Sequence, residues 1–576
     1  MYYIDVAIII IYFVIVIGMG FYLQKRASKN LESYFLGERG MHWLALSITG
    51  SSSTFDITGT MWIVSMLFIL GMKSMWIHWM WGIMMGAFFM SYMGKWVRRS
   101  NVVTGAEWML TRFGNNRGGR IARLSYTILA VTTLTSFIGY AFQGIGKFAS
   151  VYIPLEPSTC AIIIIGITTL YVLLGGLISV VFTNVIQTVI LVFSGILISF
   201  VAYKKLSPDI IKQSIPKDWS SLIPVWRLEH LQGTENAQYE LFGALVIVWV
   251  LKGLLLNGGG PAQMFDFQVF LASRNSRDAS KIGAAWSLFL IVRWGMAMGI
   301  TLLAITGIAS VNDPEQVMPI VLKEYIPVGF RGIVIAGLLA AFMSTFSATV
   351  NSGASYIVRD IWQPYFKRNA AAKQLVKAGY IATVSLVLFG ILLGLNAKSI
   401  AHIWNWLMMA LGAGVIIPNV LRWYWWRMNG WGYAVGTVVG ILLSLIVFFI
   451  PELPMYKFFP PIVLSSLAGC IIGSLATRPV DENTLVKFYS TVQPFGLWKR
   501  IRKASNLSGE EISAVSESPL YTILNVILGI IAITGFYLFP MFLVGHWYNS
   551  SMVCLGIALV SSIILIFTWY KNLPQN

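Results

Sequence analysis

Residues 47–60 read Ser47-Ile48-Thr49-Gly50-Ser51-Ser52-Ser53-Thr54-Phe55-Asp56-Ile57-Thr58-Gly59-Thr60. This run of small and polar residues lies inside an apolar segment, residues 41–70, that is long enough to cross a bilayer. Glycine in a helix interior costs about 1 kcal/mol relative to alanine, and a carboxylate at membrane depth costs roughly 2.5–3.5 kcal/mol. We therefore expect a helix that is interrupted at membrane depth, where its free backbone groups are buried in protein or line a cavity.

A second interruption lies in the apolar segment 241–270 and reads Asn257-Gly258-Gly259-Gly260-Pro261-Ala262-Gln263. Each interruption begins a block of five apolar segments, and this spacing predicts an inverted five-plus-five helix repeat whose broken first helices meet at the midplane. The alternative is that the glycines only permit close packing of helices. The expected organisation is an extra N-terminal transmembrane helix in 1–30, a first repeat in 41–203, a second repeat in 241–425, and additional C-terminal helices in 430–576 with a cytoplasmic loop at 478–516.

The composition indicates an all-α polytopic membrane protein. Of the 576 residues, 57% are hydrophobic and 11% are charged, whereas soluble domains are about 25% charged. About fifteen segments have the length of a transmembrane helix. They are residues 2–24, 41–70, 74–97, 122–151, 157–175, 177–203, 241–270, 282–309, 331–357, 376–396, 400–425, 432–450, 460–477, 519–540 and 551–571.

The net charge of +18 does not indicate a nucleic-acid partner, because the basic residues lie in short loops beside apolar segments. Placing the N-terminus outside and the C-terminus in the cytoplasm puts the more basic loops inside, so we expect a multi-pass protein of the cell membrane in contact with the lipid bilayer. The three cysteines lie in apolar runs and predict neither a disulfide nor a metal cluster. The five histidines, His78 among them, are expected at the membrane interfaces. No obligate protein partner is expected.

Asp56 requires a partner, which is either a basic residue or a bound cation. Sodium is a hard cation that prefers oxygen ligands. An interrupted helix near Thr54 and Ile57 would offer free carbonyl groups, and hydroxyl groups are available from Ser344 and Thr345. Buried serine and threonine usually bond to their own backbone, so the hydroxyl groups alone are weak support for an ion site.

Three stretches resemble the sodium/solute symporter family, which includes sodium/glucose and sodium/proline cotransporters. They occur in order within residues 1–450 and comprise Ser33-Tyr34-Phe35-Leu36-Gly37-Glu38-Arg39, the run from Gly175 to Gln187, and the run from Arg331 to Ser352 that continues to Arg359-Asp360. The resemblance implies a LeuT-like fold in which sodium lies between the broken first core helix and the eighth core helix.

Carried over by position, the resemblance implies five sodium ligands: the carbonyl groups of Thr54, Ile57 and Ala341 and the hydroxyl groups of Ser344 and Thr345. Asp56 corresponds to a position that is acidic in the proline-transporting branch and an amide in a sugar-transporting branch. Asn184 is a departure, because the family usually has Asp at this position near the sodium. Asp56 would supply the lost charge from the other side.

The solute is expected beside the two interruptions, with Thr60, Met61, Asn257, Gln263, Arg293 and Lys252 as candidate contacts. The planar guanidinium of Arg293 suits a carboxylate, and the sugar-transporting branch has a basic residue near this position. The alternatives are an ion pair with Asp56 or Asp266, or extension to the cytoplasmic face. Lys252 either neutralises Asp266 or contacts an acidic solute.

Together these features predict a sodium-coupled symporter that imports a small organic solute by alternating access. A sugar acid, an organic acid or an amino acid is favoured over a neutral hexose. A sensor with a transporter fold would be expected to carry a signalling domain, and no arrangement typical of an enzyme or a passive channel is evident. A proton-coupled symporter of the same fold is the remaining alternative.

Overall fold

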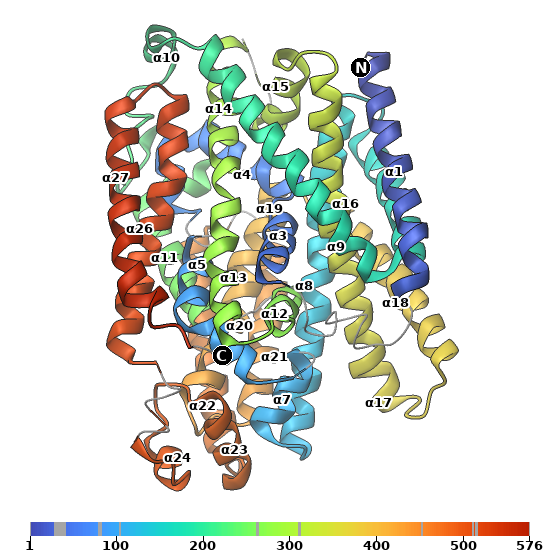
Figure 1. Cartoon of the computed structure of the whole chain (residues 1–576), viewed down its shortest axis with the longest axis vertical. Coiled ribbons are helices and arrows are strands. Elements are labelled where there is room, and N and C mark those ends of the chain that lie inside the picture. Colours follow the sequence, from blue (N-terminus) through green and yellow to red (C-terminus); the bar gives the residue numbers. More distant parts are fainter. Residues whose placement is uncertain are drawn as a thin grey trace.

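The computed structural model describes residues 2–27, 42–78, 83–102, 105–260, 264–308, 311, 313–450, 453–509, 512 and 517–574. Within these residues the chain is helical and contains no β-strand. Figure 1 shows a bundle of long helices, with the N-terminus, α10 (Pro208–Ser214) and α15 (Val317–Tyr325) at one end, and α7 (Gly105–Phe113), α23 (Glu482–Val492) and α24 (Lys499–Ala504) at the other. The all-helical membrane fold that composition predicted is confirmed.

The helices of the first half are α1 (Tyr3–Ala27), α3 (Trp43–Thr54), α4 (Ile57–Leu70), η2 (Gly71–Trp76), α5 (Met85–Phe88), η4 (Phe89–Met93), α6 (Gly94–Arg99), α8 (Arg117–Ser150), α9 (Pro157–Lys205), η5 (Glu229–Leu231), η6 (Ala237–Tyr239), α11 (Phe242–Gly258) and α12 (Met264–Leu271). Those of the second half are α13 (Ser276–Phe289), α14 (Ile291–Gly307), η7 (Pro314–Gln316), α16 (Phe330–Tyr356), η8 (Ile357–Trp362), α17 (Gln363–Tyr365), α18 (Ala372–Leu395), α19 (Ile400–Asn405), η9 (Trp406–Leu411), α20 (Gly412–Tyr424), α21 (Gly430–Phe448), α22 (Met455–Leu475), α26 (Pro519–Val544), α27 (Tyr548–Leu565) and η10 (Ile566–Tyr570).

The number of transmembrane helices differs from the sequence prediction. Among the described residues, 11 helices are long and apolar enough to cross a membrane, and three shorter apolar helices accompany them. The helical run α9 includes both predicted segments, 157–175 and 177–203. It contains two of the apolar helices just counted, Pro157–Leu170 and Gln187–Lys205, so the two segments remain separate, while the count of fifteen is not confirmed.

The helix that contains the first interruption is the most central one. The apolar window within residues 57–76 is 89% buried, whereas the corresponding window of α27 and η10 is 22% buried and that of α18 is 33% buried. α16 packs against α9, α8, α3 and α4, while α18 and α27 expose large apolar side chains on the outside of the bundle. The interrupted helix and α16 therefore form an interior that is separated from lipid by surrounding helices.

The polar segment between α22 and α26 packs against the ends of other helices. The Trp498 indole Nε1 donates to the Trp423 carbonyl at 2.8 Å, and the Leu497 amide donates to the Tyr424 carbonyl at 2.7 Å. Glu517 pairs with Arg99 at 2.7 Å and with Lys95 at 3.3 Å. The described part of the predicted loop 478–516 is thus a folded layer over α6, α7 and α20.

Candidate functional site

The first interruption is confirmed. α3 ends at Thr54, Phe55 has φ −89° and ψ 61°, and α4 begins after Asp56, which is extended at φ −85° and ψ 158°. The Asp56 carboxylate caps the new helix by accepting a hydrogen bond from the Gly59 amide at 2.9 Å. Two residues out of helical conformation leave the last carbonyl groups of α3 without a partner in their own helix.

The second interruption is also present, between α11 and α12. α11 ends at Gly258, and Gly260 has a positive φ of 78° that glycine adopts without steric cost. The Trp423 indole Nε1 donates to the Gly259 carbonyl at 3.0 Å, so this freed backbone group is satisfied by a side chain of α20. Gln263 lies outside the described residues.

Arg293, in the first turn of α14, occupies the first interruption. Its Nη1 donates to the Thr54 carbonyl at 2.8 Å, its Nε to the Thr60 hydroxyl at 3.1 Å, and its Nη2 to the Asp56 carboxylate at 3.3 Å. The ring of Phe55 lies 5.4 Å from the guanidinium carbon. The alternative in which Arg293 pairs with Asp56 is therefore the arrangement found here.

Gly59 lies directly against this ion pair. A Cβ atom on Gly59 would overlap the Asp56 carboxylate and would lie 2.7 Å from the Arg293 guanidinium and 3.0 Å from the Tyr140 hydroxyl. A side chain at position 59 would therefore have to displace at least one of these three groups.

α16 places its hydroxyl groups beside the interruption. Thr345 lines the same cavity as Thr54 and Asp56, and its hydroxyl donates to the Ala341 carbonyl at 3.1 Å. Ser344 and Ala341 are buried in the same helix, and Ile57 is a fully buried residue at the start of α4. Asn184 lies in α9, and its side chain is outside the described part of the structure.

The cavity at this point has a volume of about 70 Å³. Its polar lining comprises Thr54, Asp56, Thr58, Arg293, Thr345 and Thr349. Its apolar and aromatic lining comprises Gly59, Trp62, Ile63, His78, Leu134, Phe137, Ile138, Tyr140, Ala141, Leu290, Trp294, Phe342, Phe346 and Trp404. Of the other residues expected at the solute, Thr60 bonds to Arg293, whereas Met61, Asn257 and Lys252 are not in this lining.

The sequence did not predict the aromatic side of the cavity, called here the aromatic wall, which Trp62, Tyr140 and Trp404 form. Trp62 packs on Trp404 at 5.3 Å between ring centroids, and Tyr140 packs on Trp404 at 5.0 Å. The expectation that His78 is interfacial is wrong: it is 2% exposed and its ring lies 4.8 Å from Trp62 and 5.4 Å from Trp294. An aromatic residue in a membrane segment can lie either at the membrane–water interface or in the protein interior. The sequence alone therefore could not show which of the two positions these residues occupy.

Lys252 and Asn257 lie deep in α11. The Lys252 ammonium lies 4.5 Å from the Trp249 ring centroid, and its side chain is fully buried. The Asn257 amide donates to the Gly253 carbonyl of its own helix at 2.8 Å. Within the described residues no group of three or more His, Cys, Asp or Glu side chains suited to a metal ion is present.

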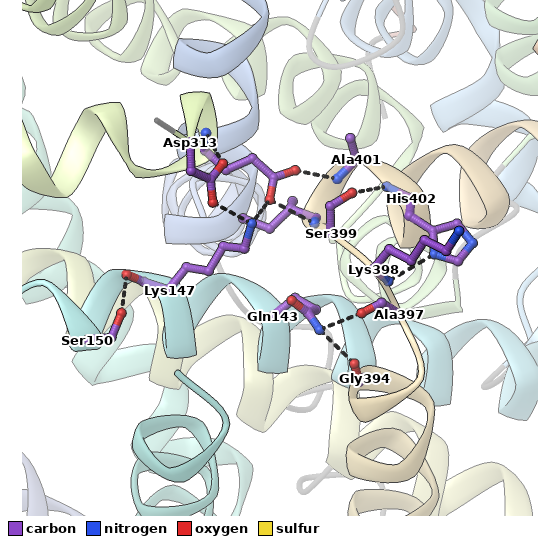
Figure 2. Close-up of polar contacts among 12 residues, drawn as sticks. Gln143, Lys147, Ser150, Asp313, Gly394, Ala397, Lys398, Ser399, Ala401 and His402 are labelled. Carbon is purple, nitrogen blue, oxygen red and sulfur yellow. Dashed lines mark hydrogen bonds and ion pairs between the residues drawn. The ribbon is translucent and has the colours of Figure 1, made fainter. Parts of the chain in front are cut away.

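A buried polar cluster, called here the Glu315 cluster, joins three elements on the side of the N-terminus (Figure 2). The Lys147 ammonium of α8 contacts Glu315 at 2.6 Å and Asp313 at 2.7 Å. The Glu315 carboxylate also accepts the Ile400 amide at 3.0 Å and the Ala401 amide at 2.8 Å, both in the first turn of α19. One carboxylate therefore links η7 to α8 and to the positive end of a helix.

The family model described as sodium:solute symporter family matches residues 34–440. The chain belongs to this family. Similar proteins include the osmoregulated proline transporter OpuE of Bacillus subtilis (22% identical, covering 82% of this chain and 95% of the relative) and a sodium/glucose cotransporter of Vibrio parahaemolyticus (24% identical, covering 84% and 92%). The high-affinity proline transporter PutP of Bacillus subtilis is 23% identical and covers 81% of this chain and 97% of its own length.

Among solved structures, this sodium:solute symporter resembles a Na⁺-coupled sialic acid symporter in a substrate-bound outward-open state. The TM-score is 0.66 at 16% identity, with 83% of this chain and 99% of that chain covered. This likeness supports the LeuT-like fold. The protein is accordingly a multi-pass, sodium-coupled symporter of a small solute, in a family whose members are transporters.

Proposed function

We propose that sodium binds at the first interruption and drives uptake of a small organic solute that binds in the adjoining cavity. The proposed sodium ligands are the carbonyl groups of Thr54, Ile57 and Ala341 and the hydroxyl groups of Ser344 and Thr345, with Asp56 and Asn184 in support. One observation carries the proposal: Thr54, Asp56 and Thr345 line a single buried cavity although they come from α3, the interruption and α16.

The chemistry of these groups suits sodium. All five proposed ligands are oxygen atoms, which a hard cation prefers. The Thr54 carbonyl lies at the C-terminal end of α3, where the helix dipole is negative, and the Asp56 carboxylate adds a full charge. A membrane potential of 100 mV supplies about 2.3 kcal/mol for each sodium ion that enters.

The solute is proposed to contact Arg293, with the aromatic wall on its apolar side. Thr60, Met61, Asn257 and Lys252 are proposed only as contacts in another state of the transport cycle, because they are not in the cavity lining described above. Gln263, which lies outside the described residues, is proposed in the same role. On the same measure as the cavity volume of about 70 Å³, a water molecule needs about 10–15 Å³. The cavity has room for about five to seven groups of the size of a water molecule. This size favours an amino acid or a short organic acid over a sugar or a sugar acid.

We further propose that residues 41–203 and 241–425 are the two five-helix repeats, since each contains an interrupted helix near its start. The N-terminus is proposed to lie outside the cell membrane and the C-terminus in the cytoplasm, in agreement with the distribution of basic loops. Lipid covers the outer helices, and transport requires no obligate protein partner.

The test is uptake by proteoliposomes of a panel of labelled amino acids, organic acids, sugar acids and sugars, with and without an inward sodium gradient. Ser344→Ala combined with Thr345→Ala removes two hydroxyl ligands worth about 1–1.5 kcal/mol each, so half-maximal uptake should require about 30–150-fold more sodium. Ser347→Ala is the matched control, because its buried hydroxyl bonds to Met343 at 2.6 Å and does not line the cavity.

Each other outcome has a definite meaning. Uptake that follows a pH gradient and ignores sodium would replace sodium by protons as the coupling ion. Uptake of none of the solutes, by a folded protein that still binds one of them, would favour a sensor. Equal sodium dependence in the double variant and in Ser347→Ala would mean that the hydroxyl groups of Ser344 and Thr345 are not sodium ligands.

A further inference from the structure

Arg293 directs all of its guanidinium nitrogens at the first interruption. Nη1 donates to the Thr54 carbonyl at 2.8 Å, Nε to the Thr60 hydroxyl at 3.1 Å, and Nη2 to Asp56 at 3.3 Å. The side chain is 5% exposed. The Thr54 carbonyl and the Asp56 carboxylate are the groups that sodium would use in the proposed function. The arginine is thus a tethered cation at the place where a free cation is expected to bind.

Sodium and the guanidinium cannot share these oxygens. Two unit charges at contact distance repel strongly in a buried site, where solvent does not screen them. When sodium neutralises Asp56 and takes the Thr54 carbonyl, the guanidinium loses two of its three partners. It then carries an uncompensated charge at membrane depth.

The displaced guanidinium has room to move in the cavity that it already lines. Among the lining residues that the structure describes, Asp56 is the one acidic side chain. Because sodium now neutralises that carboxylate, the compensating charge must come from the solute. A planar guanidinium binds a carboxylate through two parallel hydrogen bonds, which makes a carboxylate the fitting partner.

The remaining lining supports an anionic solute with an apolar part. Trp62 and His78 line the cavity and are each 2% exposed. In the described structure the Trp62 Nε1 and the His78 Nε2 have no hydrogen-bond partner. Buried polar groups are nearly always hydrogen-bonded, so these atoms indicate where a polar group of the solute binds. Phe137, Phe342 and Phe346 supply the apolar surface.

We propose that sodium and Arg293 exchange places at the first interruption, and that this exchange presents the arginine to the carboxylate of a small amphipathic solute. The inference rests on the proposed sodium site and adds both the class of solute and the side chain that links the two binding events. Because coupling between two ligands is reciprocal, the bound carboxylate also strengthens sodium binding by the same factor.

The test uses purified full-length protein in detergent. Sodium binding is followed by tryptophan fluorescence during titration with sodium chloride at constant ionic strength held with choline chloride. Solute binding is measured with labelled short carboxylates (amino acids and organic acids), each paired with its uncharged amide. In the unaltered protein, sodium should tighten the binding of one carboxylate at least tenfold and leave its amide unaffected.

Three variants separate exchange from a structural role. Arg293→Gln should bind sodium at least tenfold more tightly without solute and should lose both carboxylate binding and its dependence on sodium. Arg293→Lys retains the charge but not the planar fork, so its sodium affinity should stay within threefold of the unaltered protein while carboxylate binding weakens at least tenfold. Ser347→Ala, a buried hydroxyl on α16 away from the cavity, should change neither.

The outcomes distinguish this inference from the proposed function. If the unaltered protein binds sodium and couples it to a solute, but Arg293→Gln leaves sodium affinity and the preference for carboxylate over amide unchanged, the exchange is wrong and the symporter assignment stands. If the unaltered protein shows no sodium-dependent binding of any kind, the sodium site itself is wrong. If Arg293→Gln does not fold, unchanged carboxylate binding in Arg293→Lys overturns the exchange.

Discussion

Replacing Glu315 with glutamine should open the cavity from the side that carries η7. The Glu315 side chain is 7% exposed and accepts three charge-assisted contacts: Lys147 at 2.6 Å, the Ile400 amide at 3.0 Å and the Ala401 amide at 2.8 Å. Glutamine retains the shape of the side chain but lacks the charge. Its amide group would also place a donor against groups that are themselves donors.

The magnitude follows from these contacts. Removing one partner of a buried ion pair costs about 3–5 kcal/mol, and the lower end applies because Lys147 keeps Asp313 at 2.7 Å. This loss of stability affects only the arrangement in which α19 packs against η7, called here closed. Once α19 separates from η7, the contacts of Glu315 to Ile400 and Ala401 are absent in any case. About 3 kcal/mol shifts the ratio of closed to open molecules about 100-fold.

The cavity is affected because two of its aromatic residues lie close to the Glu315 cluster along their helices. Trp404 follows Ala401 within α19, and Tyr140 lies two turns before Lys147 in α8. The two rings pack together at 5.0 Å over the cavity. Separation of η7 from α19 and α8 removes the contacts that hold these rings in position.

Cysteine accessibility measures this opening. Cys160, Cys470 and Cys554 are the only cysteines of the chain, so their replacement by alanine gives a background in which Thr349→Cys reports on the cavity. A membrane-impermeant maleimide applied to the η7 face should label Glu315→Gln about 100-fold faster than its parent. Asp313→Asn is the control: the Asp313 side chain is 35% exposed, and its pair should contribute at most about 1 kcal/mol, or roughly fivefold. Equal labelling rates in the parent and in both variants would refute the reasoning.

Two further predictions concern other parts of the chain. Gly59→Ala should abolish sodium-driven uptake without loss of expression, because the added methyl group overlaps the Asp56 carboxylate and displaces Arg293; wild-type uptake rates would show that the interruption tolerates the change. Burial alone would raise the pKa of Glu517, but Lys95, Arg99 and the Trp96 indole more than offset this and lower it below the ordinary 4.5. Glu517 therefore stabilises the fold above pH 4.5 and loses that effect as the pH falls through its folded pKa. Glu517→Gln should lower the melting temperature at pH 7, and the difference should shrink below pH 4.5; a difference that stays constant with pH would contradict this account.

The interrupted helices could be predicted because local rules suffice for them. Glycine, proline and a carboxylate inside an apolar segment break a helix wherever the segment folds, and both predicted interruptions are present. The family resemblance, carried by motifs along the first three quarters of the chain, agrees with the match over residues 34–440.

The partners of the buried charges could not be predicted in the same way. Arg293 and Asp56 are far apart in the chain, and the sequence was equally compatible with Asp266 or the cytoplasmic face as the destination of the guanidinium. The same limit applies to the aromatic wall. Trp62 and His78 have neighbours typical of an interface, and only the packing of α4 against α19 and α14 buries them.

The ion pair at the first interruption is not accounted for by stability. Asp56 caps α4 through Gly59, yet serine or asparagine caps a helix about as well without bringing a charge into the membrane. Buried ion pairs can often be replaced by well-packed apolar residues without loss of stability. A charge pair in the wall of a cavity is useful when one member must be released, and a cation that took the oxygens of Thr54 and Asp56 would release the guanidinium held there. The geometry of the interruption thus favours a coupling role for Arg293 over a purely structural one.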